Sequence, residues 1–445
     1  MATAATQSRI ASLNINKGPL SPLEPPPATP LVKDLLEKNN KEHDIFFGKD
    51  HFHNHFPHAL LSQFALGAPE TRLKKEWQLE DYLRPLPEKQ ATEVTDSNWK
   101  EFIGIDKYYP NYLDYFKGKI ARDGVGKTVV KYALDETLLP SFVSGAVHPL
   151  IHTGFGLEFG QDIVVAEGLS EACVHKPAFA PVVDIQKYSI KSTSGKDILS
   201  IVKEVQKDPL FDDVVTFKDF PKSDPVLKNK KATDRIKEYV MQWKIVESEE
   251  GYAKAWTELF EFTTHSACSS AFPPPHITND PKYKGKHLRP VLDFFLMYFP
   301  YISRANSRHT LTATFAARAV LPFVPLSQRA LFLRVDFAVS LTYYISRGRP
   351  LIQPSKLPQT SESWQSLSEK VWKDEDLHVP KVVRALKTIA VDCGEMDETL
   401  ARNAAALVVQ EKVVNGREWS FLGHGFDEAW DKVAHETDDK ADSRM

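Results

Sequence analysis

Residues 127–159, KTVVKYALDETLLPSFVSGAVHPLIHTGFGLEF, decide the fold class. Apolar residues recur there at spacings of three and four, the periodicity of an α-helix with a buried face. Pro140 and Gly145 interrupt the pattern, because proline removes a backbone donor and glycine weakens a helix. The stretch therefore predicts two helices broken at those residues, with Pro149 in the first turn of the second helix and His148 at its entry.

The rest of the chain continues this helical pattern, and the alternation typical of strands is scarce. Further helices are expected at 195–207, 232–262, 306–322, 326–346, 363–373, 378–391, 398–413 and 425–436. Residues 177–195 could hold a short strand or two, and the prolines of residues 272–290 disfavour helix. We predict a mainly α protein, in which a disordered arm (1–30) precedes a single large helical domain (31–440) with long proline-rich loops.

The near-neutral net charge disfavours nucleic acid and anionic membranes as partners. The chain of 445 residues has 56 basic and 59 acidic residues and a formal net charge of -3, so it lacks the field that gathers nucleic acid or an anionic membrane surface. No segment approaches the apolar length of a membrane span. Three scattered cysteines without a CxxC spacing indicate a reducing compartment. We expect a cytoplasmic protein with a small-molecule or protein partner, and the oligomeric state stays open.

Two glycine motifs resemble nucleotide-binding loops. DGVGKT at 123–128 lacks the first glycine of a phosphate loop, so we interpret it as a turn and a helix N-cap. Gly154, Gly156 and Gly160 form GxGxxxG, one residue away from the dinucleotide fingerprint, in a setting that is helical rather than strand-like. We favour glycines that allow close helix packing, with a dinucleotide loop as the alternative.

Histidine is the informative residue type, and several histidines lie in DHFHNHFPHALL. His51, His53 and His55 alternate in a polar stretch and are expected to be solvated. His58 enters an apolar helix and should point toward the interior with Leu61. We therefore keep His58 as a candidate functional residue.

Other candidates stand at helix entries. His148 and His152 are four residues apart and share one helix face, a spacing that suits either two metal ligands or two core histidines. His309 heads a helix of small residues, where the alternative is a capping histidine. His378 and Lys381 lie three apart on one face of an apolar helix. An ammonium group has no lone pair, so Lys381 could bind a metal only after deprotonation or carboxylation by carbon dioxide.

Four motifs in this order resemble the questin oxidase-like family of fungal polyketide enzymes. They are NHFPHALLSQFALGA, GAVHPLIHTGFGLEF, SRHTLTATFAARAVLP and DLHVPKVVRAL. The resemblance extends from about residue 40 to 430 and implies oxidative opening of the central ring of an anthraquinone, giving a benzophenone-type product in secondary metabolism. Some members are regarded as NADPH-dependent Baeyer-Villiger-type monooxygenases. Others look like non-haem iron dioxygenases with several histidines and a carboxylated lysine.

The histidine content favours the iron description, because imidazoles suit iron and no intact dinucleotide motif is present. The resemblance implies an Fe(2+) site with the ligands His148, His152, His309, His378 and Lys381, the last carboxylated by carbon dioxide. His58 would be the general acid or base that acts on a phenol or hydroquinone. The alternative is that His58 binds the metal and His148 only orients a ligand.

The expected substrates are a small aromatic polyketide and dioxygen. A hydroquinone already carries the electrons that reduce oxygen, so NADPH is possible but not obligatory. Two rival functions remain at this stage: an NADPH-dependent monooxygenase on the same substrate class, and a non-enzymatic protein that binds aromatic metabolites.

Overall fold

The computed structural model describes residues 20, 22–48, 52–79, 83–191, 195–284, 286, 288–290, 292, 309–417 and 423–442, without the side chains of His309 and of residues 435–442. The chain divides into two compact units. Unit 1 comprises residues 1–193, 244–256 and 312–337, and unit 2 comprises residues 194–243, 257–311 and 338–445. Helices dominate the described residues, in which the strands form one two-stranded sheet, so the mainly α prediction is confirmed.

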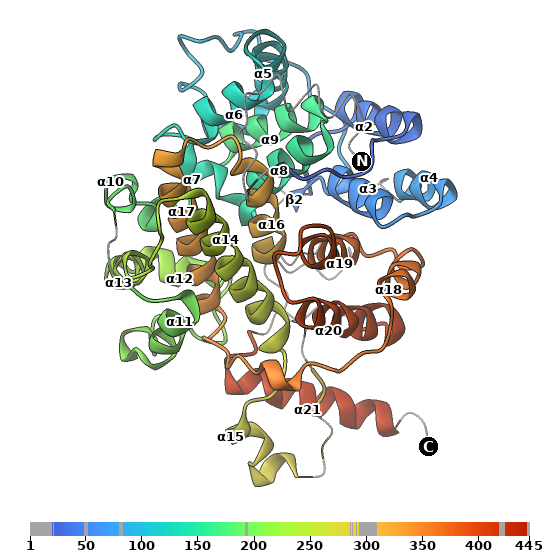
Figure 1. Cartoon of the computed structure of the whole chain (residues 1–445), viewed down its shortest axis with the longest axis vertical. Coiled ribbons are helices and arrows are strands. Elements are labelled where there is room, and N and C mark those ends of the chain that lie inside the picture. The colour runs from blue at the N-terminus through green and yellow to red at the C-terminus, as the bar shows by residue number, and fades with distance from the viewer. Residues whose placement is uncertain are drawn as a thin grey trace. The chain divides into compact units, whose positions relative to one another are not determined.

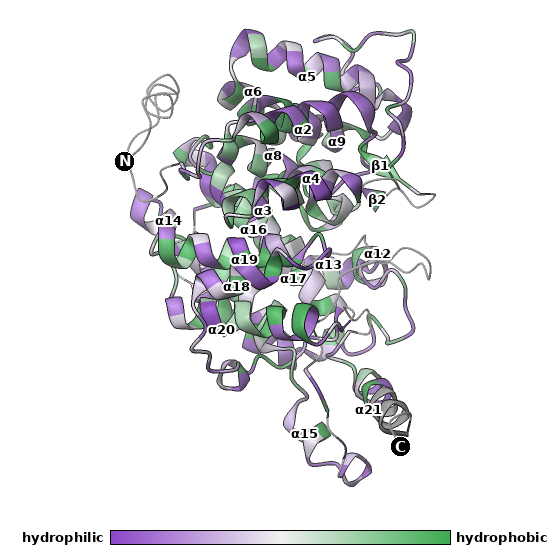
Figure 2. Cartoon of the chain, turned by 90° about the vertical axis from the view of Figure 1, so that its right-hand side faces the viewer, coloured by the Kyte–Doolittle hydropathy of each residue, from purple (hydrophilic) through white to green (hydrophobic). Residues whose placement is uncertain are grey.

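Unit 1 is built around two buried helices. Its elements are α2 (Pro30–Glu42), β1 (Phe46–Phe47), β2 (Phe52–His53), α3 (Phe56–Ala65), α4 (Glu70–Gln78), α5 (Tyr109–Asp123), α6 (Val125–Ala133), α7 (Leu139–Phe142), α8 (His148–Phe159), α9 (Asp162–Val174) and α10 (Ile185–Tyr188). α9 packs against α2, α5, α6, α7 and α8 (Figure 1). Every residue of α8 is buried, whereas α5 mixes hydrophilic and hydrophobic residues because only part of its surface packs inward (Figure 2).

Unit 2 contains a group of three mutually packed helices near the C-terminal end of the chain. Its elements are α11 (Ile198–Lys207), α12 (Ser223–Lys228), α13 (Lys230–Met241), α15 (Pro275–Thr278), α18 (Trp364–Val371), α19 (Val379–Lys387), α20 (Glu398–Val408) and α21 (Asp427–Asp442). The group consists of α18, α19 and α20 (Figure 1). Three further helices contribute residues to both units: α14 (Glu249–Thr264), α16 (His309–Val320) and α17 (Leu326–Ser346).

The sequence periodicity located most helices, and α17 has the predicted bounds. The helix predicted at 232–262 is instead two helices, α13 and α14, because Ser248 starts a new one: its hydroxyl oxygen accepts a hydrogen bond from the backbone N–H of Gly251. The short strand considered for residues 177–195 does not form in their described part, 177–191 and 195. Asp184 begins the one-turn helix α10 there by accepting from the Lys187 N–H at 2.9 Å. Proline in a first turn also permits the short α15 within residues 272–290.

The glycines of α8 allow close packing, as predicted. A Cβ atom at Gly154 would lie 2.6 Å from the Cβ atom of Ala316 in α16, and one at Gly156 would lie 2.5 Å from the backbone nitrogen of Val165 in α9. Real Cβ atoms do not approach neighbours so closely, so only glycine fits at these two positions. The run lies within and at the end of a helix and therefore forms no dinucleotide-binding loop.

The DGVGKT motif also behaves as predicted. Gly124 has a φ of 86° between α5 and α6, a left-handed conformation that glycine adopts without strain, and it precedes the first residue of α6. The motif is therefore a helix-to-helix turn. Among the described helices, none is both long and apolar enough to cross a bilayer.

Candidate functional site

Histidines and glutamates gather in unit 1, on β2, on the turn and helix that follow it, on α8, and from the middle of α9 to the residue after its end. They are His53, His55, His58, His148, His152, Glu167, Glu171 and His175. The side chains of His58 and Glu171 are 0% exposed. Ionisable groups are buried only at a cost in free energy, which partners or bound ions must offset. A functional centre is therefore expected here.

A chain of contacts joins His58, His152 and Glu167. His58 Nε2 lies 2.9 Å from His152 Nδ1, and His152 Nε2 lies 2.9 Å from Glu167 Oε2. The other carboxylate oxygen of Glu167 accepts a hydrogen bond of 2.7 Å from the Asn40 side-chain amide. Because the carboxylate accepts from the ring, it holds the His152 proton on Nε2 and turns the lone pair of Nδ1 toward His58. Carboxylates orient histidines in this way for metal binding and for proton transfer.

His148 faces a different histidine. Its Nδ1–H donates to the backbone carbonyl of Gly145 at 2.7 Å, and the Nδ1–H of His55 donates to the backbone carbonyl of His53 at 2.6 Å. The two Nε2 atoms of His148 and His55 lie 2.9 Å apart. Two neutral rings with their protons on Nδ1 would turn lone pairs toward each other, so this pair requires an additional proton or a cation. It is therefore suited to deliver a proton.

A third group consists of His53, Glu171 and His175. His53 Nε2 and His175 Nε2 lie 2.7 Å apart, and Glu171 Oε1 lies 3.6 and 3.7 Å from them, respectively. Glu171 and His175 are four residues apart, so they lie on one face at the end of α9. Burial, followed by the charge of Glu167, raises the pKa of Glu171 well above its usual value. These three side chains are close enough together to hold a metal ion.

In unit 2, Asp376 orients His378 at the start of α19. One oxygen of Asp376, Oδ1, accepts from the backbone N–H groups of His378 and Val379 at 2.7 and 3.1 Å and from His378 Nδ1–H at 3.2 Å. Asp376 thus fixes the turn that leads into α19, whose N-cap residue is His378, and holds the His378 proton on Nδ1, which leaves the lone pair on Nε2. The side chain of His378 is 1% exposed.

Lys381 is buried in the first turn of α19 and is 1% exposed. Its Nζ atom has no hydrogen-bond partner among the described residues. Burial lowers the pKa of Lys381 from 10.5 to about 7, and the carboxylate of Asp376 opposes that change. A buried amine of this kind is neutral in a large fraction of molecules at neutral pH, so it can react with carbon dioxide.

The predicted site residues therefore fall into two sets. His58, His148 and His152 lie in unit 1, where His58 contacts His152 and His148 contacts His55. His378 and Lys381 lie in unit 2, three residues apart at the start of one helix. His309 is the first residue of α16, and its side chain lies outside the described part of the chain.

Several members of the unit 1 cluster were not predicted from the sequence. His53 and His55 were expected to be solvated, yet His55 is 3% exposed and the side chain of His53 is 11% exposed. Glu167, Glu171 and His175 were not singled out. Each of these residues lies four positions after the previous one, so two carboxylates and an imidazole follow one face of a largely apolar helix. This spacing was a usable signal.

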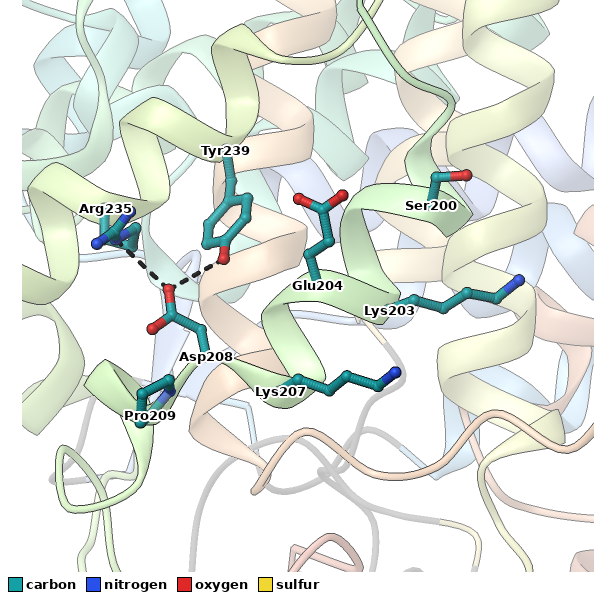
Figure 3. Close-up of a pocket in the computed structure, with 8 residues that line it drawn as sticks. All are labelled: Ser200, Lys203, Glu204, Lys207, Asp208, Pro209, Arg235 and Tyr239. Carbon is teal, nitrogen blue, oxygen red and sulfur yellow. Dashed lines mark hydrogen bonds and ion pairs between the residues drawn. The ribbon is translucent and has the colours of Figure 1, made fainter.

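A surface groove of about 580 Å³ lies in unit 2 beside α11 and α13 (Figure 3). It is lined by Ser200, Lys203, Glu204, Lys207, Asp208, Pro209, Arg235 and Tyr239. Asp208 accepts a hydrogen bond of 3.0 Å from the Tyr239 hydroxyl and forms an ion pair of 3.4 Å with Arg235. Five of the eight lining residues are charged, so the groove does not resemble the largely uncharged pocket that an aromatic substrate needs.

Comparison with known proteins defines the class of this chain. The sequence model of the questin oxidase-like family matches residues 52–386, well over half of the chain, so the chain belongs to that family. It is 24% identical to a Baeyer-Villiger oxidase of Pestalotiopsis microspora over 97% of this chain and 99% of that protein. It is 25% identical to a Baeyer-Villiger monooxygenase of Aspergillus aculeatus (90% and 89%) and 24% identical to a questin oxidase of Aspergillus fumigatus (79% of each). These relatives support an oxidoreductase.

Proposed function

We propose that this chain is an iron(II)-dependent dioxygenase that opens the central ring of an anthraquinone in its hydroquinone form. The family and the relative named questin oxidase support this substrate class. The observation that carries the choice of iron is Lys381, a buried amine without a hydrogen-bond partner among the described residues and with a pKa lowered to about 7. A carboxylated Lys381 would turn this unsatisfied group into an anionic oxygen ligand.

The histidines of both units support this proposal, each set within its own unit. His152 is oriented by Glu167 and His378 by Asp376, and in each case the carboxylate holds the ring proton on the nitrogen away from the available lone pair. This pairing of a carboxylate with a histidine is the usual environment of a metal-binding imidazole. The family resemblance, rather than the geometry, implies that both sets serve one iron ion.

The contact between His58 and His152 supports the alternative in which His58 is a ligand. Two imidazole nitrogens bound to the same iron lie about 3 Å apart, because each metal–nitrogen bond is about 2.1 Å long. His58 Nε2 and His152 Nδ1 are 2.9 Å apart, whereas His148 Nε2 is directed to His55. We therefore assign His58 and His152 as ligands with His309, His378 and carboxylated Lys381, and we assign His148 to proton transfer.

The residues of the chain then have separate tasks. Iron(II), when bound, supplies the activation of dioxygen that cleavage of a carbon–carbon bond requires. Glu167 and Asp376 keep two histidines in the tautomers that present a lone pair. The His55–His148 pair exchanges a proton with the phenolic oxygen of the substrate.

An NADPH-dependent monooxygenase is the second candidate, because two of the relatives are named as Baeyer-Villiger enzymes. The two candidates differ in metal content. For a dioxygenase we expect at least one iron per chain in active protein, and removal of iron by a chelator should abolish turnover. Full activity with NADPH in protein that holds less than roughly a tenth of an iron per chain would reject the iron proposal.

Single substitutions test the ligand assignment through bound iron, measured independently of turnover. We expect His58→Ala, His152→Ala and His378→Ala each to lower iron content, while His148→Ala retains iron and loses turnover. The opposite result for His58 and His148 would restore the assignment in which His148 binds iron and His58 acts as the acid or base. A protein that only binds aromatic metabolites would consume no oxygen with an anthraquinol.

A further inference from the structure

The group formed by His53, Glu171 and His175 has the geometry of a metal site. Its three facing atoms, two Nε2 atoms and Glu171 Oε1, form a triangle with sides of 2.7, 3.6 and 3.7 Å. A point in the plane of this triangle lies about 2.0 Å from all three atoms, close to the ~2.0–2.2 Å bonds that imidazole and carboxylate form with zinc. The side chains therefore need little movement to bind an ion.

A direct hydrogen bond between the two imidazoles accounts for only part of this arrangement. It explains the separation of 2.7 Å between His53 and His175. It does not explain Glu171, which is 0% exposed and whose two oxygens have no hydrogen-bond partner among the described residues. Left ionised, this carboxylate would be a buried charge, and when protonated it would bury an unsatisfied hydroxyl. A cation beside Oε1 removes both costs.

We propose that His53, Glu171 and His175 bind a second divalent transition-metal ion, in addition to the iron that the proposed function requires. Two imidazoles and one carboxylate are a ligand set that suits zinc and iron(II). Three protein ligands leave at least one position open to water. This second site goes beyond the proposed function. It is tested at His53, Glu171 and His175, which the proposed function does not use as iron ligands.

The surroundings hold the ligands in place and leave a path for the ion. β1 pairs with β2, so the backbone of His53 is fixed opposite Phe46. Gly145 lies against the ring of His175: a Cβ atom there would be 2.2 Å from His175 Nε2, so only glycine leaves room for the imidazole. The side chains of His53 and His175 are 11% and 14% exposed while Glu171 is fully buried, which places the solvent-accessible side at the imidazoles.

Glu171 also connects this group to the histidines of the candidate site. Its second oxygen, Oε2, lies 3.7 Å from His152 Nδ1. The carboxylate is therefore flanked by His53 and His175 on one side and by His152 on the other. An ion bound at Oε1 would fix the orientation of the carboxylate next to a proposed iron ligand.

Metal titration of the full chain tests the inference. The protein is stripped of metal with a chelator, supplied with bicarbonate, and titrated with Zn(2+) alone and, without oxygen, with Fe(2+) alone. The bound metal is then counted by elemental analysis after gel filtration. We expect wild type to bind two ions per chain with at least one of these metals. Glu171→Gln, which preserves the size of the side chain, should bind one.

Two further variants distinguish loss of a ligand from a folding defect in Glu171→Gln. His53→Ala changes a partly exposed side chain and should also bind only one ion. The dissociation constant of the affected site should rise by more than about a hundredfold. Loss of a residue that only orients a ligand has a smaller effect, about 10–100-fold. His43→Ala is the matched control, because His43 is a half-buried histidine of the same unit that contacts Asn39 and Trp77. It should bind two ions.

The outcomes separate this inference from the proposed function. Loss of one ion in His53→Ala and Glu171→Gln, but not in His378→Ala, supports the second site even if the iron proposal fails. Unchanged metal content in both His53→Ala and Glu171→Gln, compared with wild type, overturns the second site. Loss of metal in His378→Ala alone leaves the iron proposal intact and rejects this one.

Discussion

At the scale of single residues, the central feature is a buried lysine whose amine is easily deprotonated. Most lysines keep a charged amine in water, whereas Lys381 is 1% exposed and burial lowers its pKa to about 7. The sequence indicated this residue through its place on an apolar helix face. It could not indicate the degree of burial, because burial depends on the helices that cover that face.

The lowered pKa leads to a prediction about carboxylation. Carbon dioxide reacts with a neutral amine to form a carbamate and release a proton, so the reaction is favoured above the amine pKa. Above about pH 7 Lys381 is mostly neutral in the folded protein, whereas an ordinary lysine is neutral only above about pH 10.4. We expect ¹³C NMR of protein supplied with ¹³C-bicarbonate to show a carbamate signal at pH 8 that declines as the pH falls below about 7.

A matched lysine provides the control for that signal. Lys222, in the same unit, is 5% exposed, but its Nζ atom donates to the backbone carbonyls of Thr216, Phe217 and Asp219. The carbamate signal should persist in Lys222→Met and vanish in Lys381→Met. A signal that survives in Lys381→Met would return Lys381 to a structural role.

At the scale of secondary-structure elements, helix beginnings place the candidate residues. α8 starts at His148 after Ala146 and Val147, which have φ values of 52° and 66°, and α19 starts after His378. Positive φ values cost free energy for residues other than glycine. The tight entry of α8 is therefore strained, and it turns the ring of His148 back onto the carbonyl of Gly145.

Asp376, in the turn before α19, should have two separable roles. Asp376→Ala removes the acceptor of the His378 and Val379 backbone N–H groups and should lower the free energy of unfolding by about 1–3 kcal/mol, measured by chemical denaturation. It should also weaken iron binding by about 10–100-fold, because His378 loses the partner that fixes its tautomer. Asp197→Ala is the control: it removes the N-cap of α11, where Asp197 accepts from the Ser200 N–H at 2.8 Å. Equal iron affinity in both variants would contradict the role of Asp376.

Close packing of α8 predicts that alanine substitutions at Gly154 and Gly118 change the free energy of unfolding in opposite directions. Gly154→Ala places a Cβ atom 2.6 Å from Ala316 and should lower the free energy of unfolding by about 1–3 kcal/mol. Gly118→Ala in α5 meets no atom within 4 Å and should raise it by about 0.5–1 kcal/mol, because alanine favours helix. Denaturation curves of both variants check the pair, and a neutral Gly154→Ala would argue against the contact between α8 and α16.

At the scale of the whole molecule, the sequence predicted the fold class but only part of the candidate site. Helical periodicity is a local property, so most helices, the turn at Gly124 and the role of the α8 glycines followed from the sequence. The partners of each histidine depend on contacts between distant segments. The contacts of His58 with His152, and of His53 with His175, join residues 94 and 122 positions apart, and no local pattern encodes them.

The source of the oxygen atoms in the product distinguishes a dioxygenase from an NADPH-dependent monooxygenase. A dioxygenase that acts on an anthraquinol adds both atoms of one O₂ to the carbon skeleton, because the two electrons and two protons of the hydroquinone stay in the product. A monooxygenase that acts on the quinone places one oxygen atom in the product, reduces the other to water and consumes one NADPH.

The most direct measurement is mass spectrometry of the ring-opened product formed under ¹⁸O₂ by the iron-loaded chain with an anthraquinol and without NADPH. An iron-dependent dioxygenase would give a product that contains two ¹⁸O atoms from the same O₂ molecule. A product that forms only with NADPH and contains a single ¹⁸O atom would contradict it.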